Sequence, residues 1–92
     1  MNQVTFRIDK ELIEITEHFK DPVKCAAITS ILYFAQGVLQ RDNQLKSYER
    51  ENGYTRIKCV TGHIVFEVLK ETLREYKNKW PKEIKMFDNE VV

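Results

Sequence analysis

Cys25 and His18 are the residues of this chain whose types and spacing suggest catalysis. Asp21-Pro22 precedes the cysteine, and a capping side chain directly before a proline is typical of a helix start. Cys25 is therefore expected in the first turn of a helix, where unpaired N–H groups and the helix dipole favour a thiolate. Lys24 beside it adds a positive charge. His18, a few residues upstream at the end of an expected strand, is within reach to act as a general base.

The same two residues also have a purely structural interpretation. Cys25 is followed by two alanines, so it fits equally well as a small core residue. His18 would then be a solvated loop residue. Composition alone favours this second interpretation.

The residues around this pair predict a β-hairpin followed by a helix. Short alternating runs at residues 4–8 and 12–15 flank a polar link and are typical of paired strands. The helix is expected to begin at Pro22 and to fray over residues 40–43. Its apolar residues recur at steps of three and four, which predicts one broad buried stripe. That stripe comprises Val23, Ala26, Ala27, Ile31, Phe34, Ala35, Val38 and Leu39.

A second hairpin and a second helix are predicted downstream. Asn52-Gly53 is a strong turn signal between alternating runs at residues 45–50 and 54–60. The second helix ends at Pro81. Its predicted stripe comprises Ile64, Val65, Val68, Leu69, Leu73, Tyr76 and Trp80. Residues 84–87 are expected to add a short edge strand.

The order ββαββα implies an α+β two-layer sandwich, with two helices on one face of a mostly antiparallel sheet. At 92 residues, the chain is expected to form one domain over residues 1–92. No glycine-rich phosphate loop is present, because the glycines are isolated. No cofactor is therefore expected.

Charge and hydropathy limit the partners and the location. Lys and Arg total 15 against 14 Asp and Glu, a net charge of +1, which removes the electrostatic argument for nucleic acid as the main partner. The longest apolar run, residues 31–35, is far shorter than the ~20 residues that cross a bilayer, so no membrane is expected as a partner. The N-terminus lacks the pattern of a signal peptide. We therefore expect a cytoplasmic protein with reduced cysteines.

The segment from Ile15 to Leu32 resembles the ribosomal-processing cysteine protease (Prp) family of bacteria. That family has Gly-His-Ala at the end of the second strand and then Asp-x-Val-Cys-Ala-Ala-x-Ser-x-Leu at a helix start. Here the corresponding residues are Glu17-His18-Phe19 and Asp21-Pro22-Val23-Lys24-Cys25-Ala26-Ala27. The chain length, the order of elements and the Asn-Gly turn also agree with the family.

The resemblance implies a cysteine endopeptidase that trims the N-terminal extension of a large-subunit ribosomal protein, and it implies a homodimer. Cys25 matches the nucleophile and His18 the general base. Asp21 matches an acidic residue that we interpret as the helix cap rather than a third catalytic residue. Backbone N–H groups at Cys25 and Ala26 are expected to stabilise the oxyanion.

Three departures from the family pattern touch this site. Glu17 and Phe19 replace a glycine and an alanine, the loop before Cys25 is shorter, and Lys24 is an extra residue. A bulky Phe19 is expected to re-aim the imidazole, and Glu17 is placed to stabilise an imidazolium. The alternative function is therefore a non-catalytic interaction module on the same fold, phage-encoded and binding a host protein.

The other candidate residues favour structural roles. Cys59 and His63 could join His18 and Cys25 as zinc ligands, but the short Cys-x2-Cys spacing of a zinc site is absent, so a buried strand cysteine is favoured. His63 is expected to be solvated or part of the helix end. Charged residues of the second helix are predicted to form a solvated outer face. These are Lys70, Glu71, Arg74, Glu75, Lys77 and Lys79.

Overall fold

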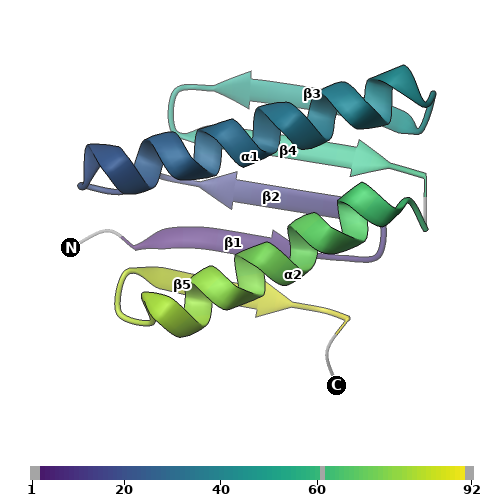
Figure 1. The fold of residues 1–92 in the computed structure, drawn as a ribbon. Coiled ribbons are helices and arrows are strands. Elements are labelled where there is room, and N and C mark those ends of the chain that lie inside the picture. The colour runs from purple at the N-terminus through teal and green to yellow at the C-terminus, as the bar shows by residue number, and fades with distance from the viewer. Residues whose placement is uncertain (1–2, 61, 91–92) are drawn as a thin grey trace.

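The computed structural model describes residues 3–60 and 62–90 and contains a five-stranded sheet covered by two helices (Figure 1). The elements are β1 (Val4–Ile8), β2 (Leu12–Thr16), α1 (Pro22–Arg41), β3 (Leu45–Glu51), β4 (Tyr54–Cys59), α2 (Ile64–Lys79) and β5 (Ile84–Asp88). The predicted ββαββα order and α+β class are confirmed.

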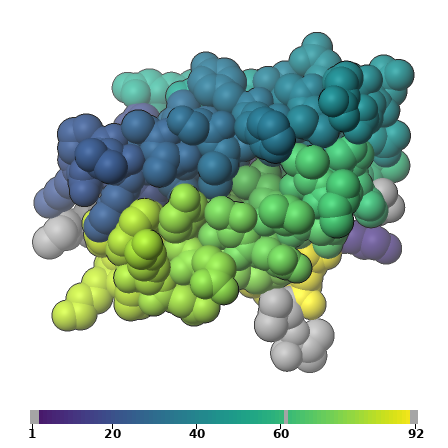
Figure 2. Space-filling model, viewed as in Figure 1, coloured from purple at the N-terminus to yellow at the C-terminus, as the bar shows by residue number. Residues whose placement is uncertain are grey.

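The sheet has the strand order β3-β4-β2-β1-β5. Every neighbouring pair is antiparallel except β1 and β5, which run parallel. Both helices cover the same face (Figure 1), and they lie side by side over it in the space-filling view (Figure 2). Strand residues alternate between the covered face and the open face, so Val4, Phe6 and Ile8 are buried while Arg7 is exposed.

The buried face of α1 differs from the predicted stripe. The helix buries Ile28, Leu32, Ala35 and Leu39. Val23 and Phe34, both assigned to the buried stripe, are 75% and 66% exposed. The prediction was wrong because α1 carries apolar residues around most of its circumference, so three- and four-residue spacing fits more than one face.

α1 is also long and apolar enough to meet a length-and-composition test for a membrane span, contrary to the expectation from the longest apolar run. Within this fold the row from Ile28 to Leu39 packs into the hydrophobic core instead. A core helix meets the same test.

α2 follows its prediction in part. Leu69 and Leu73 are buried, and Phe66, which the predicted stripe left out, is buried with them. Ile64 and Val68 are exposed. The end of the stripe is as expected, because Tyr76 and Trp80 pack against the core and stack on each other with ring centroids 4.8 Å apart.

Candidate active site

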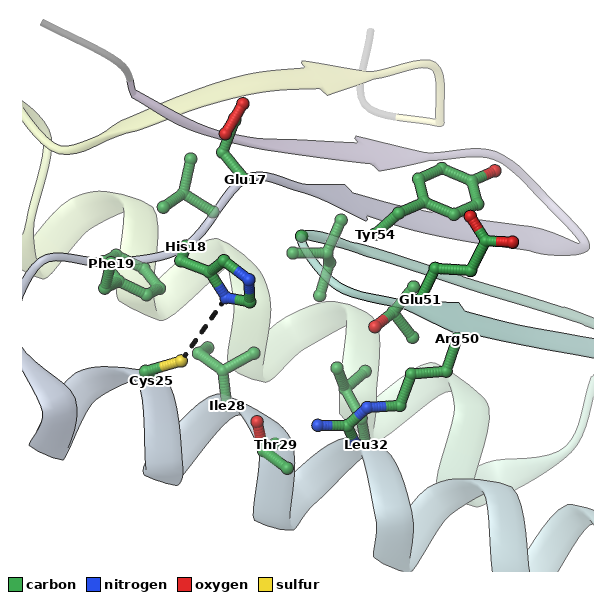
Figure 3. A pocket seen from close by; sticks show the side chains of 14 residues that line it. Glu17, His18, Phe19, Cys25, Ile28, Thr29, Leu32, Arg50, Glu51 and Tyr54 are labelled. Carbon is green, nitrogen blue, oxygen red and sulfur yellow. Dashed lines mark hydrogen bonds between the residues drawn. The ribbon is translucent and has the colours of Figure 1, made fainter.

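The structure brings Cys25 and His18 together. The Sγ atom of Cys25, in the first turns of α1, lies 3.8 Å from Nδ1 of His18, which lies in the loop after β2. Figure 3 shows the imidazole ring pointing toward the sulfur. Cys25 is half-buried and His18 is exposed, so the pair is accessible from solvent. A thiol and an imidazole in this arrangement are the parts of a nucleophile and its base.

Asp21 fixes the start of the helix that carries the thiol. Its Oδ1 accepts a hydrogen bond of 2.8 Å from the backbone N–H of Val23, and Pro22 is the first helical residue. The side chain therefore acts as the N-cap, which satisfies one of the unpaired donors at the helix start.

The expected oxyanion donors are not free. The N–H of Cys25 donates to the carbonyl of Asp21 across 3.1 Å. Because the helix begins at Pro22, Cys25 is its fourth residue, and the fourth residue is the first whose N–H finds a carbonyl one turn back. Ala26 lies one residue further into the helix. The N–H of Cys25, one of the two groups expected to stabilise an oxyanion, is therefore already paired within the chain.

Glu17 adopts a backbone conformation that favours glycine. Its φ is 77°, in the left-handed region. Its N–H donates to the carbonyl of Gly53 across 2.8 Å, which ties the end of β2 to the turn between β3 and β4. The Prp family pattern has a glycine at this position. Figure 3 shows the Glu17 carboxylate directed away from the His18 ring, so the expected contact with an imidazolium is absent.

Phe19 anchors the short loop that presents the histidine. Its ring is buried and packs edge-on against Phe6 and Trp80, with centroid separations of 6.4 and 5.7 Å. Adjacent residues thus point in opposite directions, Phe19 into the core and His18 toward Cys25. The expectation that a bulky residue here re-aims the imidazole is not met, because the core holds the larger ring.

A third polar side chain, Asn52, touches the histidine. Its Oδ1 lies 2.8 Å from Nε2 of His18, on the opposite side of the ring from the sulfur contact. Sequence reasoning used Asn52 only as a turn residue. The pairing of β2 with β4 brings this turn beside His18, since Thr16 lies opposite Tyr54.

Lys24 is held away as part of another contact. Its ammonium forms an ion pair with Glu83 and lies 4.7 Å from the centroid of the Trp80 ring. Its charge is therefore already matched by a carboxylate rather than left unpaired beside the thiol.

A shallow cleft with a cavity volume of ≈ 40 Å³ lies beside the pair. Its walls include Ile28, Thr29 and Leu32 from α1 and Arg50, Glu51 and Tyr54 from the β3–β4 hairpin (Figure 3). A second hollow of ≈ 300 Å³ also has His18 in its wall and is lined by Gln3, Lys20, Lys82 and Glu83 among others. The smaller volume admits only a few water molecules. A peptide would therefore lie across the surface rather than inside a closed pocket.

The other sulfur and imidazole lie apart from this site. Cys59 is fully buried in the core, and burial raises the pKa of its thiol to about 11. His63 caps α2 by accepting from the N–H of Val65, and its Nε2 lies 2.8 Å from Oδ2 of Asp42. Across residues 3–60 and 62–90, no three His, Cys, Asp or Glu side chains are grouped as metal ligands. Cys59 is thus a buried strand cysteine, as favoured.

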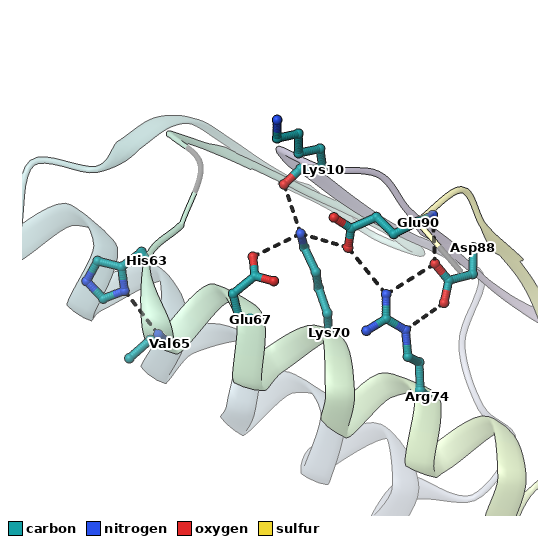
Figure 4. Close-up of polar contacts among 8 residues, drawn as sticks. All are labelled: Lys10, His63, Val65, Glu67, Lys70, Arg74, Asp88 and Glu90. Carbon is teal, nitrogen blue, oxygen red and sulfur yellow. Dashed lines mark hydrogen bonds and ion pairs between the residues drawn. The ribbon is translucent and has the colours of Figure 1, made fainter. Parts of the chain in front are cut away.

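The prediction that the charged residues of α2 form a solvated outer face is wrong for Lys70. This side chain is 0% exposed, and its ammonium contacts the Lys10 carbonyl and the carboxylates of Glu67 and Glu90 at 2.8, 3.1 and 2.9 Å (Figure 4). Arg74 bonds to Asp88 in the same cluster. A buried ammonium is tolerated because each of its donors finds an oxygen.

Solved structures with a similar fold include proteases. A crystal structure of the ribosomal processing protease Prp from S. aureus with a covalently linked product peptide matches 97% of this chain and 100% of its own, with TM-score 0.73 and 10% identity. The same protease with a substrate peptide gives TM-score 0.72 and 9% identity over 95% and 98% of the two chains.

A third match is SMU.848 from Streptococcus mutans, with TM-score 0.69 and 17% identity over 94% of this chain and 95% of that one. No protein-family model and no curated protein matches the sequence. At these identities the likeness bears on the fold. The chain therefore has a Prp-like α+β fold, in agreement with the resemblance seen in its sequence.

Proposed function

We propose that this protein is a cysteine endopeptidase in which Cys25 is the nucleophile and His18 the general base. The observation that carries the proposal is the 3.8 Å separation of Sγ and Nδ1, in an accessible site near the N-terminus of a helix. The positive end of the helix dipole favours negative charge on the sulfur. The Prp-like fold supports the same activity, because the matched S. aureus protein is a protease.

The reaction is an acyl transfer in two halves. Nδ1 of His18 takes the proton from Sγ of Cys25, and the thiolate attacks the peptide carbonyl carbon to form a tetrahedral intermediate. The C–N bond then breaks as the imidazolium returns its proton to the leaving amine, which leaves a thioester on Cys25. Water, deprotonated by the neutral imidazole, attacks the thioester. As the C–S bond breaks, the carboxylic acid is released and the imidazolium returns its proton to Sγ of Cys25, which restores the thiol.

The proposed substrate is a protein with an extended N-terminal segment, and the sequence resemblance favours a large-subunit ribosomal protein. The S. aureus Prp structures hold a substrate peptide and a product peptide, which supports a peptide partner for the same fold. An exposed, shallow cleft suits an extended peptide better than a folded domain. With a ribosomal protein as substrate, the proposal includes a cytoplasmic location.

The test is cleavage of a ribosomal protein that carries its N-terminal extension. Cys25→Ala and His18→Ala are each expected to lower the cleavage rate by at least about a hundredfold. Cys59→Ala makes the same chemical change outside the site, and its cleavage rate per folded molecule should match that of the parent protein. Unchanged cleavage by Cys25→Ala would discard the assignment. Absence of cleavage by the parent protein would favour the non-catalytic interaction module.

The proposal includes a homodimer. Phe34, Ile64 and Val68 are large exposed apolar side chains on neighbouring faces of α1 and α2, around a groove of ≈ 200 Å³. A domain of this size buries little more than roughly 60% of its unfolded-chain surface, so a second copy on this face adds apolar burial. Phe34→Asp should give a monomer in sedimentation velocity. Phe87→Asp, on the open face of the sheet, is the matched control and should leave the dimer intact.

A further inference from the structure

We propose that Asn52 is the positioning residue for the base of this site, through its hydrogen bond to His18. The inference rests on the proposed function and assigns a third residue to the same reaction. Oδ1 of Asn52 and Sγ of Cys25 contact the two different nitrogens of the ring, at 2.8 and 3.8 Å. The ring is therefore held between the turn of one hairpin and the start of α1.

The contact selects the tautomer that catalysis needs. An amide oxygen only accepts hydrogen bonds, so Nε2 must carry a hydrogen to bond with Oδ1 of Asn52. In a neutral imidazole the other nitrogen, Nδ1, is then an acceptor. Nδ1 is the atom that faces Sγ of Cys25. Asn52 thus leaves the lone pair of His18 directed at the proton to be removed.

The same contact persists when the proton moves. In the imidazolium both ring nitrogens are donors, so Nε2 keeps its bond to Oδ1 while Nδ1 becomes a donor toward the thiolate or the leaving amine. The ring can therefore take and return a proton without rotating. A base held in one orientation avoids the loss of rate that misplacement by about 1 Å brings.

The turn that carries Asn52 is itself fixed against the histidine. Strands β3 and β4 pair up to Glu51 and Tyr54, directly beside the turn. The Gly53 carbonyl accepts from the backbone of Glu17 at 2.8 Å. A Cβ atom added to Gly53 would lie 3.6 Å from Nε2 of His18, so the turn backbone packs against the ring edge.

The turn does not itself require asparagine at this position. Gly53 has a φ of 79°, whereas Asn52 is not among the residues with positive φ in the described parts of the chain. Positive φ at only the second central residue is the pattern of a type II turn, in which many residue types occupy the first central position. Alanine is therefore compatible with the backbone at position 52, and the side-chain amide is left with the bond to His18 as its role.

The test compares Asn52→Ala, Asn52→Asp and His18→Ala in the full chain. The first readout is the rate of Cys25 alkylation by iodoacetamide between pH 5 and pH 9, located by mass spectrometry. The second is kcat and KM for the extended ribosomal protein. Asn78→Ala removes the same amide from an exposed position on α2 and is the matched control. Circular dichroism and urea unfolding establish that each variant is folded.

Asn52→Ala should shift the alkylation profile to that of His18→Ala, and should lower kcat about 10- to 100-fold with KM within about twofold. Asn52→Asp keeps an acceptor oxygen and should retain kcat within about threefold, with its profile displaced toward higher pH because the carboxylate favours the imidazolium. Asn78→Ala should behave as the parent protein.

A parent-like alkylation profile in Asn52→Ala would overturn the proposal, as would an Asn52→Asp variant as impaired as Asn52→Ala. If His18→Ala has the same alkylation profile as the parent protein, the proposal is overturned as well, since the ring would then not act on the sulfur. If the parent protein cleaves nothing but the alkylation profiles shift as expected, the role of Asn52 stands and the endopeptidase proposal fails. If cleavage depends on Cys25 but the Asn52 variants behave as the parent protein, the endopeptidase proposal stands and the proposed role of Asn52 fails.

Discussion

The backbone N–H of Glu17 donates to the carbonyl of Gly53 across 2.8 Å, and both residues have φ in the left-handed region, at 77° and 79°. This bond joins the end of β2 to the β3–β4 turn directly beside His18. Gly53 adopts its conformation without strain, whereas Glu17 carries a Cβ atom that crowds its own backbone. The site is therefore assembled at a local conformational cost.

Glu17→Gly should stabilise the fold. Removing the Cβ atom relieves about 1–2 kcal/mol of left-handed strain, partly offset by about 0.5–1 kcal/mol of glycine backbone entropy. We expect a net rise of roughly 0.5–1 kcal/mol in the free energy of unfolding, measured with urea. Glu17→Ala is the control, because alanine keeps the strain. An equal gain from both variants would assign the effect to the charge of Glu17 instead.

The two thiols should differ sharply in reactivity. Burial raises the pKa of Cys59 to about 11, so at pH 8 only about one molecule in a thousand carries its thiolate. Cys25 is partly accessible beside an imidazole. Native protein should therefore take up a single iodoacetamide adduct, on Cys25, and a second only after unfolding in guanidinium chloride. Intact-mass measurement counts the adducts. Fast modification of Cys59 in the native protein would contradict the buried position.

Lys70 should be replaceable by an apolar residue of similar length. Its carboxylate partners Glu67 and Glu90 are 45% and 27% exposed, so both can regain water when the ammonium is removed. We expect Lys70→Met to change the free energy of unfolding by less than about 1 kcal/mol. Lys70→Ala also loses the packed stem and should cost roughly 2 kcal/mol or more. Equal losses in the two variants would show that the ion pairs, rather than the stem, provide the stability.

Asp42 should contribute acid-sensitive stability at the end of α1. Hydrogen bonds from Arg41 and His63 lower the pKa of this carboxyl from 3.8 to about 2. Because the folded-state value is the lower one, the contribution is complete above about pH 4 and is lost as the pH falls toward 2. The stability difference between the parent protein and Asp42→Asn should therefore shrink over that interval in urea titrations. Glu75→Gln, at an exposed position on α2, is the control, and its stability difference from the parent protein should not change over that pH interval.

The loop between β2 and α1 shows which structural features local sequence signals predict and which they miss. Asp21-Pro22 predicted the helix start, and the structure has the helix beginning at Pro22. That prediction placed Cys25 near the helix N-terminus and His18 upstream within reach. The prediction counted the N–H of Cys25 among the unpaired donors of the helix start. Counted from the cap residue, this N–H is instead the first that is paired within the helix.

Asn52 could not be assigned to the site from its position in the sequence. Its partner His18 is 34 residues away, and the contact depends on the register of β2 against β4. A turn signal specifies backbone conformation at the turn and carries no information about which strand pairs beside it.

The sequence by itself determined the hairpins, the two helices, their order and the residues available for chemistry, because capping, turn formation and strand alternation are local properties of the chain. Only the tertiary structure decided which face of α1 is buried. It also placed Lys70 in a carboxylate cluster and brought Asn52 into hydrogen-bond contact with His18. These outcomes depend on side chains brought together from distant elements. Spacing alone does not distinguish the apolar faces of one helix, and it does not locate the partner of a buried charge.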